Sequence, residues 1–320
     1  MNDITVFGAG AFGTALAISL ARDGRSVSLV ARDAGHAKEM AKTGENSARL
    51  PGHRFPDLLT PTTDTSNPAP ICLMAVPAQS LAGYLDQIAP DLADSSIVAC
   101  CKGIDLTTGL GPTAIIGKSC PDAIAATLSG PSFAVDIAAG LPTALTLACA
   151  DSFDAARLQA MLSTSNLRLY TSTDVIGTEL GGALKNVIAI AAGVAVGAGL
   201  GESARAALMT RGYAEMQRFA QSYGADSATL SGLSGLGDLV LTCTSRKSRN
   251  YSFGLALGAG KTTDTSKTVE GIATAKVVSI IGKKRRISMP ITDVVAALVE
   301  DKLTVSQAVE MLLSRPLRKE

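Results

Sequence analysis

The sequence motif that most constrains the fold lies within the first 13 residues. Ile4–Phe7 is a short apolar run typical of a β-strand, and Gly8-Ala9-Gly10-Ala11-Phe12-Gly13 follows it directly. The next segment, Ala11–Ala21, reads as a helix that ends near Gly24. A GxGxxG sequence alone is a weak signal, but between a strand and a helix it marks a dinucleotide-binding βαβ unit. The start of the chain therefore predicts a Rossmann-like fold.

Each glycine of this motif has a separate physical role. Gly8 permits a tight turn, Gly10 lets the backbone approach a pyrophosphate, and Gly13 lets the helix pack close to the sheet. The helix N-terminus offers unpaired N–H donors and a positive potential to the phosphates. The alternative is a glycine-rich turn that binds nothing, which the position after a strand disfavours.

The residues after the second expected strand, Val27–Val30, bear on the choice of coenzyme. An acidic residue about 20 positions after the fingerprint binds the ribose diol of NAD, whereas an arginine accepts the 2′-phosphate of NADP. This chain has Arg32 followed by Asp33. Arg32 favours NADP(H), and Asp33 leaves NAD(H) open.

The rest of the chain divides into two parts that differ in the secondary structure their sequence patterns predict. Apolar strand-like runs separated by helices continue to about residue 172, which indicates a mostly parallel sheet covered on both faces. Beyond Thr178 only helical periodicity remains. We therefore expect an α/β, Rossmann-like, doubly wound dinucleotide-binding domain over residues 1–177 and an all-helical substrate-binding domain over residues 178–320. The further expected strands are Ile71–Val76, Ile97–Cys101, Ile124–Leu128, Ala144–Cys149 and Leu167–Tyr170, and the expected helices are Thr178–Leu200, Glu202–Tyr223, Asn250–Leu257, Val269–Ile281, Ile291–Val299 and Val305–Leu313.

Composition excludes several classes of function. The 29 Lys+Arg nearly balance the 28 Asp+Glu, and there is no tryptophan, so a protein that coats nucleic acid or an anionic membrane is not expected. None of the six cysteines forms a CxxC pair and there are only two histidines, which argues against a metal site. The N-terminus has no export signal, so the expected compartment is the cytoplasm.

One lysine stands in a long uncharged run. Lys185 is the only charge between Gly181 and Gly201, in a segment rich in Ala, Val, Ile and Gly. The apolar stretch after Asn186 is too short to span a bilayer comfortably, so we expect a buried core helix and no stable membrane insertion. Burial favours the neutral form of an amine, which makes Lys185 a candidate general base. The alternative is a lysine whose stem packs while its ammonium reaches water.

The basic run Lys283–Arg286 is the other conspicuous charge feature. It follows Gly282 at an expected helix end, where cations complement exposed carbonyl groups. A solvated turn is the favoured interpretation, and a patch that binds an anion is the alternative.

Several segments, in order along the chain, closely resemble those of the bacterial NAD(P)-dependent sn-glycerol-3-phosphate dehydrogenase family. The segments that carry the resemblance are Lys102–Ile104, Ser129–Ala134, Glu179–Gly193, Ala204–Arg211, Gly235–Thr244, Ser248–Asn250 and Val269–Gly271. The resemblance implies reversible reduction of dihydroxyacetone phosphate to sn-glycerol 3-phosphate for glycerophospholipid synthesis, with NADP(H) or NAD(H), in a homodimer. Another dehydrogenase of the same layout, specific for a phosphorylated substrate or a hydroxyacid, is the alternative function.

The resemblance also implies roles for individual residues. Lys185 is then the proton donor and acceptor. The implied substrate residues are Lys102, Gly130, Ser132, Lys185, Asp238, Ser248, Arg249 and Asn250. The implied coenzyme contacts, with the fingerprint glycines Gly8, Gly10 and Gly13, are Ala11, Phe12, Arg32, Lys102, Ala134, Arg249 and Glu270.

Most of these residues also have a plain structural interpretation. Composition alone favours Asp238 as the N-cap of a helix carrying Leu239–Leu241, although its carboxylate could instead orient Lys185. Ser248 to Asn250 offer donors for a phosphate and can also cap the next helix, and we expect both. Glu270 stands at a helix start, where an acidic residue is favourable without any ligand.

Overall fold

The computed structural model describes residues 2–262 and 268–313 of the chain. The chain forms two compact units, each described here by itself. The first comprises Met1–Lys102 and Leu110–Glu179, and the second comprises Gly103–Gly109 and Leu180–Glu320. The chain thus leaves the first unit after Lys102, contributes the short segment Gly103–Gly109 to the second unit, and returns to the first unit at Leu110.

The first unit is built on one eight-stranded sheet. Its strand order is β3-β2-β1-β4-β5-β6-β7-β8, and only the β6–β7 pair is antiparallel. The predicted Rossmann-like, mostly parallel sheet is therefore confirmed. The strands are β1 Ile4–Phe7, β2 Val27–Val30, β3 Leu59–Thr62, β4 Ile71–Met74, β5 Ser96–Ala99, β6 Ile124–Ser129, β7 Thr143–Cys149 and β8 Leu167–Ser172.

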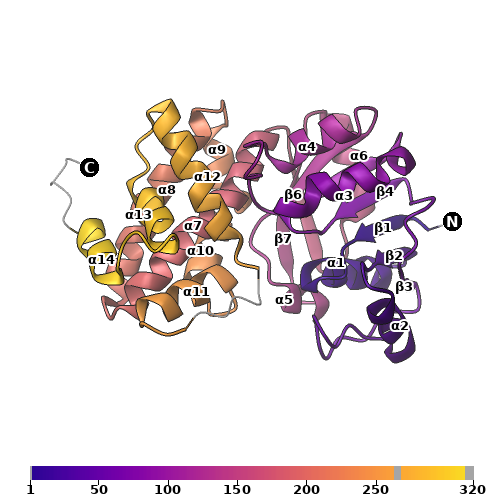
Figure 1. Ribbon diagram of the computed structural model, residues 1–320. Coiled ribbons are helices and arrows are strands. Elements are labelled where there is room, and N and C mark those ends of the chain that lie inside the picture. The colour runs from indigo at the N-terminus through magenta and orange to yellow at the C-terminus, as the bar shows by residue number, and fades with distance from the viewer. Residues whose placement is uncertain (1, 263–267, 314–320) are drawn as a thin grey trace. The chain divides into compact units, whose positions relative to one another are not determined.

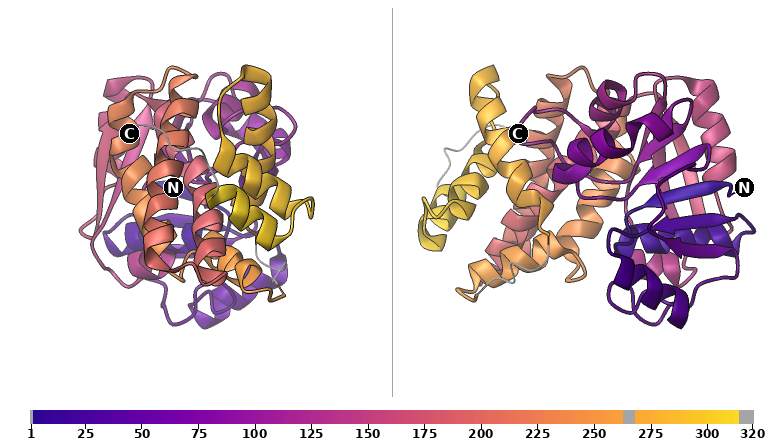
Figure 2. Two further views of the ribbon diagram at one scale, coloured as in Figure 1. Left: turned by 90° about the vertical axis from the view of Figure 1, so that its left-hand side faces the viewer. Right: turned by 45° about the vertical axis from the view of Figure 1, so that its right-hand side comes forward.

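Helices cover both faces of this sheet (Figure 1, Figure 2). Because side chains alternate along a strand, Val6 of β1 packs with α1 and α5, and its neighbour Phe7 packs with α3 and α4 on the opposite face. Strands buried on both faces need continuous apolar sequences, which is why the sequence made them recognisable. The helices of this unit are α1 Ala11–Arg22, α2 Ala34–Thr43, α3 Leu81–Ile88, α4 Pro112–Ser119, α5 Ala134–Ala138 and α6 Ser152–Leu162, with the short 3-10 turns η1 Ala78–Ser80 and η2 Ala89–Leu92.

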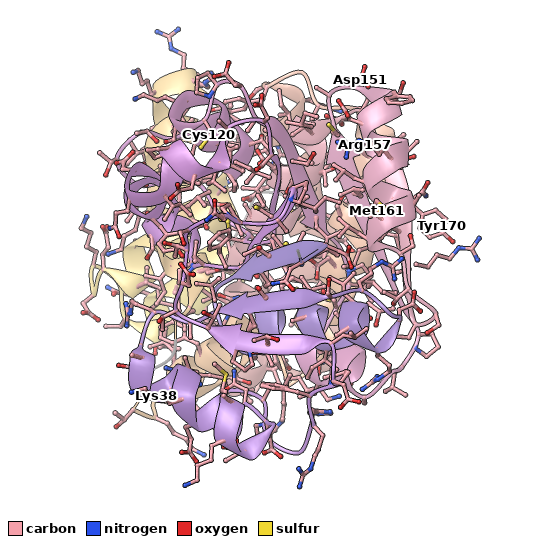
Figure 3. All side chains as sticks on the ribbon, turned by 90° about the vertical axis from the view of Figure 1, so that its right-hand side faces the viewer. Lys38, Cys120, Asp151, Arg157, Met161 and Tyr170 are labelled. Atoms are coloured by element: carbon pink, nitrogen blue, oxygen red, sulfur yellow. The ribbon has the colours of Figure 1, made fainter. Side chains whose placement is uncertain are left out.

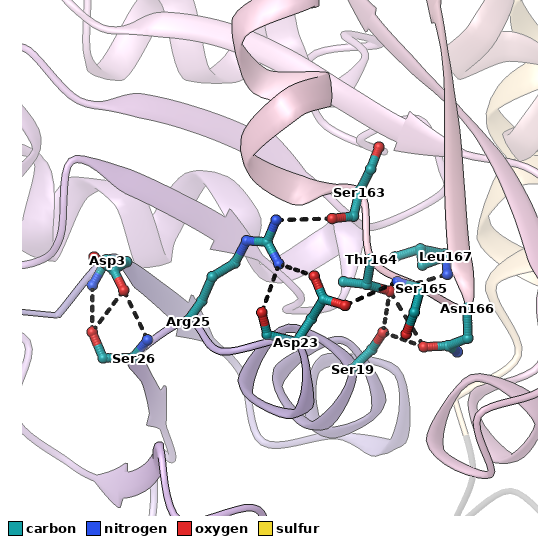
Figure 4. A network of polar contacts seen from close by, with 10 residues as sticks. All are labelled: Asp3, Ser19, Asp23, Arg25, Ser26, Ser163, Thr164, Ser165, Asn166 and Leu167. Carbon is teal, nitrogen blue, oxygen red and sulfur yellow. Dashed lines mark hydrogen bonds and ion pairs between the residues drawn. The ribbon is translucent and has the colours of Figure 1, made fainter.

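Polar contacts tie the end of α1 to the turn before β8 (Figure 4). Arg25 donates to the Ser163 carbonyl at 2.9 Å, and the Asp23 carboxylate accepts from the Ser165 N–H at 3.0 Å. Ser19 of α1 lies 2.8 Å from the Thr164 hydroxyl. The first helix is therefore held at its C-terminal end, while its N-terminal end faces the glycine turn.

The helix α6 lies against β8, the last strand of the sheet. Arg157 and Met161 follow one another along α6, beside Tyr170 of β8 (Figure 3). The Arg157 guanidinium donates to the Ser96 hydroxyl of β5 at 2.8 Å. This bond ties α6 to β5.

The second unit is helical around α7, Val175–Gly197, of which it contains the part from Leu180 onward. This helix is long and apolar enough to cross a membrane, but 89% of its most apolar stretch is buried within the protein. It is therefore a core helix. Its companions are α8 Gly201–Gln221, α9 Ser227–Ser231, the π-helical turn η3 Leu233–Gly237, α10 Asp238–Thr244, α11 Arg249–Gly258, α12 Glu270–Arg285, α13 Pro290–Val299 and α14 Val305–Leu313.

Small residues let α11 approach α7 closely. A Cβ at Gly193 would lie 2.3 Å from the Tyr251 carbonyl oxygen, and one at Gly254 would lie 2.2 Å from the Ile190 carbonyl oxygen. No side chain fits at such distances, so both positions require glycine. This close crossing places the start of α11 beside the middle of α7.

The end of α12 differs from the expectation. The helix does not stop at Ile281 but continues to Arg285, and Arg286 adopts a left-handed conformation with φ 58° after it. Gly282 is buried against Met289 inside the helix. Gly282 therefore serves close packing, and the basic run belongs to the last helical turn.

Candidate active site

The glycine turn of the first unit joins β1 to α1. Gly8 has a φ of +109°, and a Cβ there would lie 2.7 Å from the Ala75 carbonyl oxygen. A Cβ at Gly13 would lie 2.1 Å from the Gly8 carbonyl oxygen, whereas nothing lies within 4 Å of a Cβ at Gly10. Gly8 and Gly13 thus allow the tight turn and close packing, and Gly10 leaves open space in front of the backbone.

The first turn of α1 has the features of an anion site. Its N-cap is Gly10, which provides no side-chain cap, and no acidic residue occupies the first turn. Ala11 and Phe12 are half-buried there. Uncapped N–H groups and the helix dipole suit a pyrophosphate, and the open space at Gly10 gives room for it. These residues therefore fit a dinucleotide.

A buried asparagine holds this turn in place. Asn46 is fully buried, and its amide donates to the Ala9 carbonyl at 3.0 Å and to the Thr14 hydroxyl at 2.8 Å. Its Oδ1 lies 2.9 Å from His36 Nε2. No sequence pattern points to Asn46, because it lies 33 positions after Gly13 in a segment without periodicity.

The two residues after β2 differ in what they do. Asp33 is the N-cap of α2, and its carboxylate accepts from the His36 N–H at 2.7 Å. Arg32 is exposed. One oxygen of the Asp33 carboxylate is thus occupied by a structural bond, while the Arg32 guanidinium is open to solvent.

Three of the predicted substrate residues meet where β5 and β6 end. The Lys102 amine donates to the Gly130 carbonyl at 2.9 Å, and the Ser132 hydroxyl donates to the same oxygen at 3.3 Å. Gly130 has a φ of +144°, so this turn favours glycine. Ala134 begins α5 directly after the turn. Because β1, β5 and β6 all run parallel, this group and the glycine turn lie at the same, carboxyl edge of the sheet.

Lys185 of α7 is buried in the second unit, with 7% of its surface exposed. Its Nζ donates to Asp238 Oδ1 at 2.8 Å and to the Thr242 hydroxyl at 2.6 Å. The Thr242 hydroxyl also lies 3.2 Å from the same carboxylate oxygen. The amine is therefore fixed by a carboxylate and a hydroxyl that stand one turn apart on α10.

This arrangement decides between the two roles expected for Asp238. Asp238 is not the N-cap of α10, since that position is Gly237, and its carboxylate instead accepts from the Lys185 amine. A buried carboxylate beside the amine opposes the desolvation that burial imposes on its charged form. The group can hold a proton at a defined place and release it to an acceptor that develops negative charge.

The Ser248–Asn250 segment forms the start of α11. The Ser248 hydroxyl accepts from the Tyr251 N–H at 3.2 Å, so the predicted cap is confirmed. Asn250 is buried; it donates to Asn186 Oδ1 at 2.9 Å and accepts from the Gly271 N–H at 2.9 Å. Arg249 is exposed between these two buried side chains.

Asn250 therefore joins three helices, α7, α11 and α12. Asn186 follows the lysine on α7, and Gly271 follows Glu270, the first residue of α12. Glu270 thus stands at a helix start, as expected.

Two further polar residues, Thr242 and Asn186, belong to this group and were not singled out from the sequence. Thr242 follows Asp238 by four residues, which places both on one face of a helix. Asn186 is the direct neighbour of Lys185.

Comparisons with known proteins agree with these features. Residues 3–155 match the family model described as "NAD-dependent glycerol-3-phosphate dehydrogenase N-terminus", and residues 174–310 match the corresponding C-terminus model. Glycerol-3-phosphate dehydrogenases [NAD(P)+] from Roseobacter denitrificans and Cereibacter sphaeroides are 58% and 56% identical, over 99% of this chain and 99% and 100% of theirs.

A solved structure extends the comparison. The glycerol-3-phosphate dehydrogenase from Coxiella burnetii has a TM-score of 0.93 and 37% identity, over 98% of this chain and 99% of that one. Sequence and fold therefore match over nearly the whole length, and the chain belongs to the NAD(P)-dependent glycerol-3-phosphate dehydrogenase family.

Proposed function

We propose that this chain catalyses the reversible reduction of dihydroxyacetone phosphate to sn-glycerol 3-phosphate. The observation that supports it most is the Lys185 amine, buried and fixed by Asp238 and Thr242 in a chain of this family. In this proposal residues 1–177 bind the dinucleotide, and residues 178–320 bind the substrate and supply the proton.

The chemistry assigns Lys185 a role at the substrate oxygen. The hydride for the carbonyl carbon comes from the reduced nicotinamide when it is bound. Lys185 stabilises the negative charge that develops on the oxygen and delivers a proton to it. In the reverse direction the amine takes the hydroxyl proton. Asp238 and Thr242 hold Nζ in one orientation, which removes the cost of ordering a flexible side chain.

The substrate phosphate needs a cation and several donors. Arg249 offers an exposed guanidinium at the start of α11. The Ser248 hydroxyl accepts a backbone bond, so its own proton remains available for donation. Asn250 uses one of its two amide protons on Asn186, which leaves the other. We assign Lys102, Gly130, Ser132 and Asp238 to the substrate site as well.

The coenzyme assignment follows the glycine turn. Gly8, Gly10 and Gly13 shape the pyrophosphate site, and Arg32 is placed to accept a 2′-phosphate. NADP(H) is thus favoured, with NAD(H) as the second coenzyme. The remaining proposed contacts are Ala11, Phe12, Lys102, Ala134, Arg249 and Glu270.

The product is a precursor of glycerophospholipids, and we place the enzyme in the cytoplasm as a homodimer. Size-exclusion chromatography with light scattering tests the dimer directly.

The catalytic role is tested by Lys185→Ala. We expect turnover with dihydroxyacetone phosphate and NADPH to fall by about 10²–10⁴-fold, the range for loss of a positioned acid–base group. Circular dichroism and coenzyme binding should remain normal, since the glycine turn belongs to the first unit. Lys302→Ala, at an exposed lysine of the second unit, is the control and should keep full turnover. Near-normal turnover of Lys185→Ala would refute the assignment.

A further inference from the structure

The basic run Lys283–Arg286 plays no part in the proposed reaction. Lys283, Lys284 and Arg285 form the last turn of α12, and Arg286 follows as its C-cap. Cations at a helix C-terminus complement the exposed carbonyl groups. Four consecutive cations also give this helix end a concentrated positive charge.

The residues before this run give the helix an unusual outer face. Ile280 precedes Lys283 by three positions and Lys284 by four, so the three side chains lie together on one face. Ile280 is 67% exposed, among the most exposed large apolar side chains of the described chain. We call Ile280, Lys283, Lys284 and Arg286 the α12 basic stripe.

The cations of the stripe differ in their contacts from Arg285, which lies outside it. Arg285 stacks over the Tyr223 ring at 4.0 Å and donates to the Ser222 carbonyl at 3.2 Å, so it serves the fold. Within residues 2–262 and 268–313, no hydrogen bond or ion pair holds the side chains of Lys283, Lys284 or Arg286.

One carboxylate, Glu300, acts on the stripe, but its ion pairs are with two other lysines. Glu300 lies 2.8 Å from Lys302 and 3.9 Å from Lys276. The hydrogen bond from Lys302 and the charges of Lys302, Lys276 and Lys283 hold the pKa of Glu300 below its usual value. Three lysines thus share one carboxylate.

We propose that the α12 basic stripe binds the surface of an anionic phospholipid bilayer. Lysine and arginine side chains at a membrane surface gain from the negative potential of anionic headgroups, and the exposed Ile280, one helical turn before the lysines, can enter the interface. Because the charges of the chain as a whole nearly balance, the attraction comes from this local group of cations and not from the net charge. Nucleic acid fits less well, because Arg285 covers the nearby ring of Tyr223 and a base would gain little from Ile280.

Vesicle sedimentation of the full chain tests this inference. At about 0.1 M salt we expect the wild type to bind vesicles of 30% phosphatidylglycerol in phosphatidylcholine. The affinity of Lys283→Gln/Lys284→Gln should be roughly 30-fold weaker, because each lysine near the surface contributes a factor of about five. Ile280→Ser should weaken binding roughly fivefold without changing its salt dependence. About 1 M salt should release the protein, since the Debye length then falls to about 3 Å.

The matched control removes two lysines from another exposed helix. Lys38 and Lys42 lie on α2 of the first unit, and Figure 3 labels Lys38 on its outer surface. Lys38→Gln/Lys42→Gln lowers the net charge equally and should leave vesicle binding within about twofold of the wild type. Turnover in solution should be normal in all three variants. A negative result in the vesicle experiment would therefore not count against the proposed reaction. The inference would be overturned if the protein bound pure phosphatidylcholine vesicles as tightly as anionic ones, or if Lys38→Gln/Lys42→Gln lost as much binding as Lys283→Gln/Lys284→Gln. It would also be overturned if a single-stranded RNA probe bound tightly while vesicles did not bind at all.

Discussion

At the scale of single residues, the fingerprint glycines fall into two kinds: Gly8 and Gly13 are needed for packing, whereas Gly10 is expected to be needed only for the ligand. A Cβ would have no neighbour within 4 Å at Gly10 but would clash at Gly8 and Gly13. Gly10→Ala should therefore fold normally and yet obstruct the approach of a pyrophosphate. We expect the KM for NADPH to rise by about tenfold or more with little change in Tm, measured by steady-state kinetics and thermal melts.

Gly83 provides the matched substitution. It lies within α3, and a Cβ there also meets nothing within 4 Å. Gly83→Ala should raise stability by about 0.5–1 kcal/mol, because glycine is a poor helix former, and leave the KM unchanged. If Gly10→Ala bound NADPH as tightly as Gly83→Ala, the pyrophosphate would have to lie elsewhere.

The sequence predicted residue types better than residue partners. Lys185 stood out because a charge in an apolar run is rare. Composition favours a cap at Asp238 over a contact with Lys185, because that partner lies 53 positions earlier and no local pattern connects the two. Thr242 and Asn46 were missed for the same reason, since each acts through a contact made only after the chain has folded.

At the scale of secondary structure, apolar runs identified seven of the eight strands. The missed strand β3 reads Leu-Thr-Pro-Thr and lies at the edge of the sheet, where one face carries little burial and proline is tolerated. The end of α12 was placed too early, because Gly282 resembles a helix stop. A glycine can also serve close packing inside a helix, and local sequence does not distinguish the two cases.

Glu179 links two helices and predicts a pH-dependent stability. On α7, its carboxylate accepts from the Thr113 N–H of α4 at 2.7 Å. Burial raises the pKa of Glu179 to about 7 from 4.5. The folded chain therefore keeps a proton that the unfolded chain releases, so this stabilisation is complete below about pH 4.5 and is lost as the pH rises through about 7.

The substitution Glu179→Gln keeps an acceptor for Thr113 and removes the ionisation. Compared with the wild type, it should be equally stable near pH 4 and more stable near pH 8.5, by on the order of 3 kcal/mol, measured by urea unfolding at both values. Glu39→Gln, at an exposed glutamate of α2, should show no such difference. A stability difference independent of pH would mean that Glu179 is ionised throughout.

At the scale of the whole molecule, contacts within the folded chain decide which residues belong to each unit, and the sequence pattern does not predict all of these contacts. Gly103–Gly109 follows a strand of the first unit but groups with the second, where Gly109 lies near Ile281 of α12. Asp105 is buried in this segment and accepts from the N–H groups of Thr107 and Thr108. Composition separates a sheet-rich half from a helical half, but it cannot assign a short polar turn to either.

Coenzyme preference can be measured from how much each coenzyme raises the thermal stability of the whole chain. A ligand that binds only the folded state at 100 times its Kd adds about 2.7 kcal/mol. Because Arg32 is exposed and one Asp33 oxygen caps α2, we expect Arg32→Ala to lose most of the rise in Tm caused by NADPH and to keep the rise caused by NADH. Arg211→Ala, at an exposed arginine of α8, should keep both. An unchanged NADPH response in Arg32→Ala would show that another group holds the 2′-phosphate.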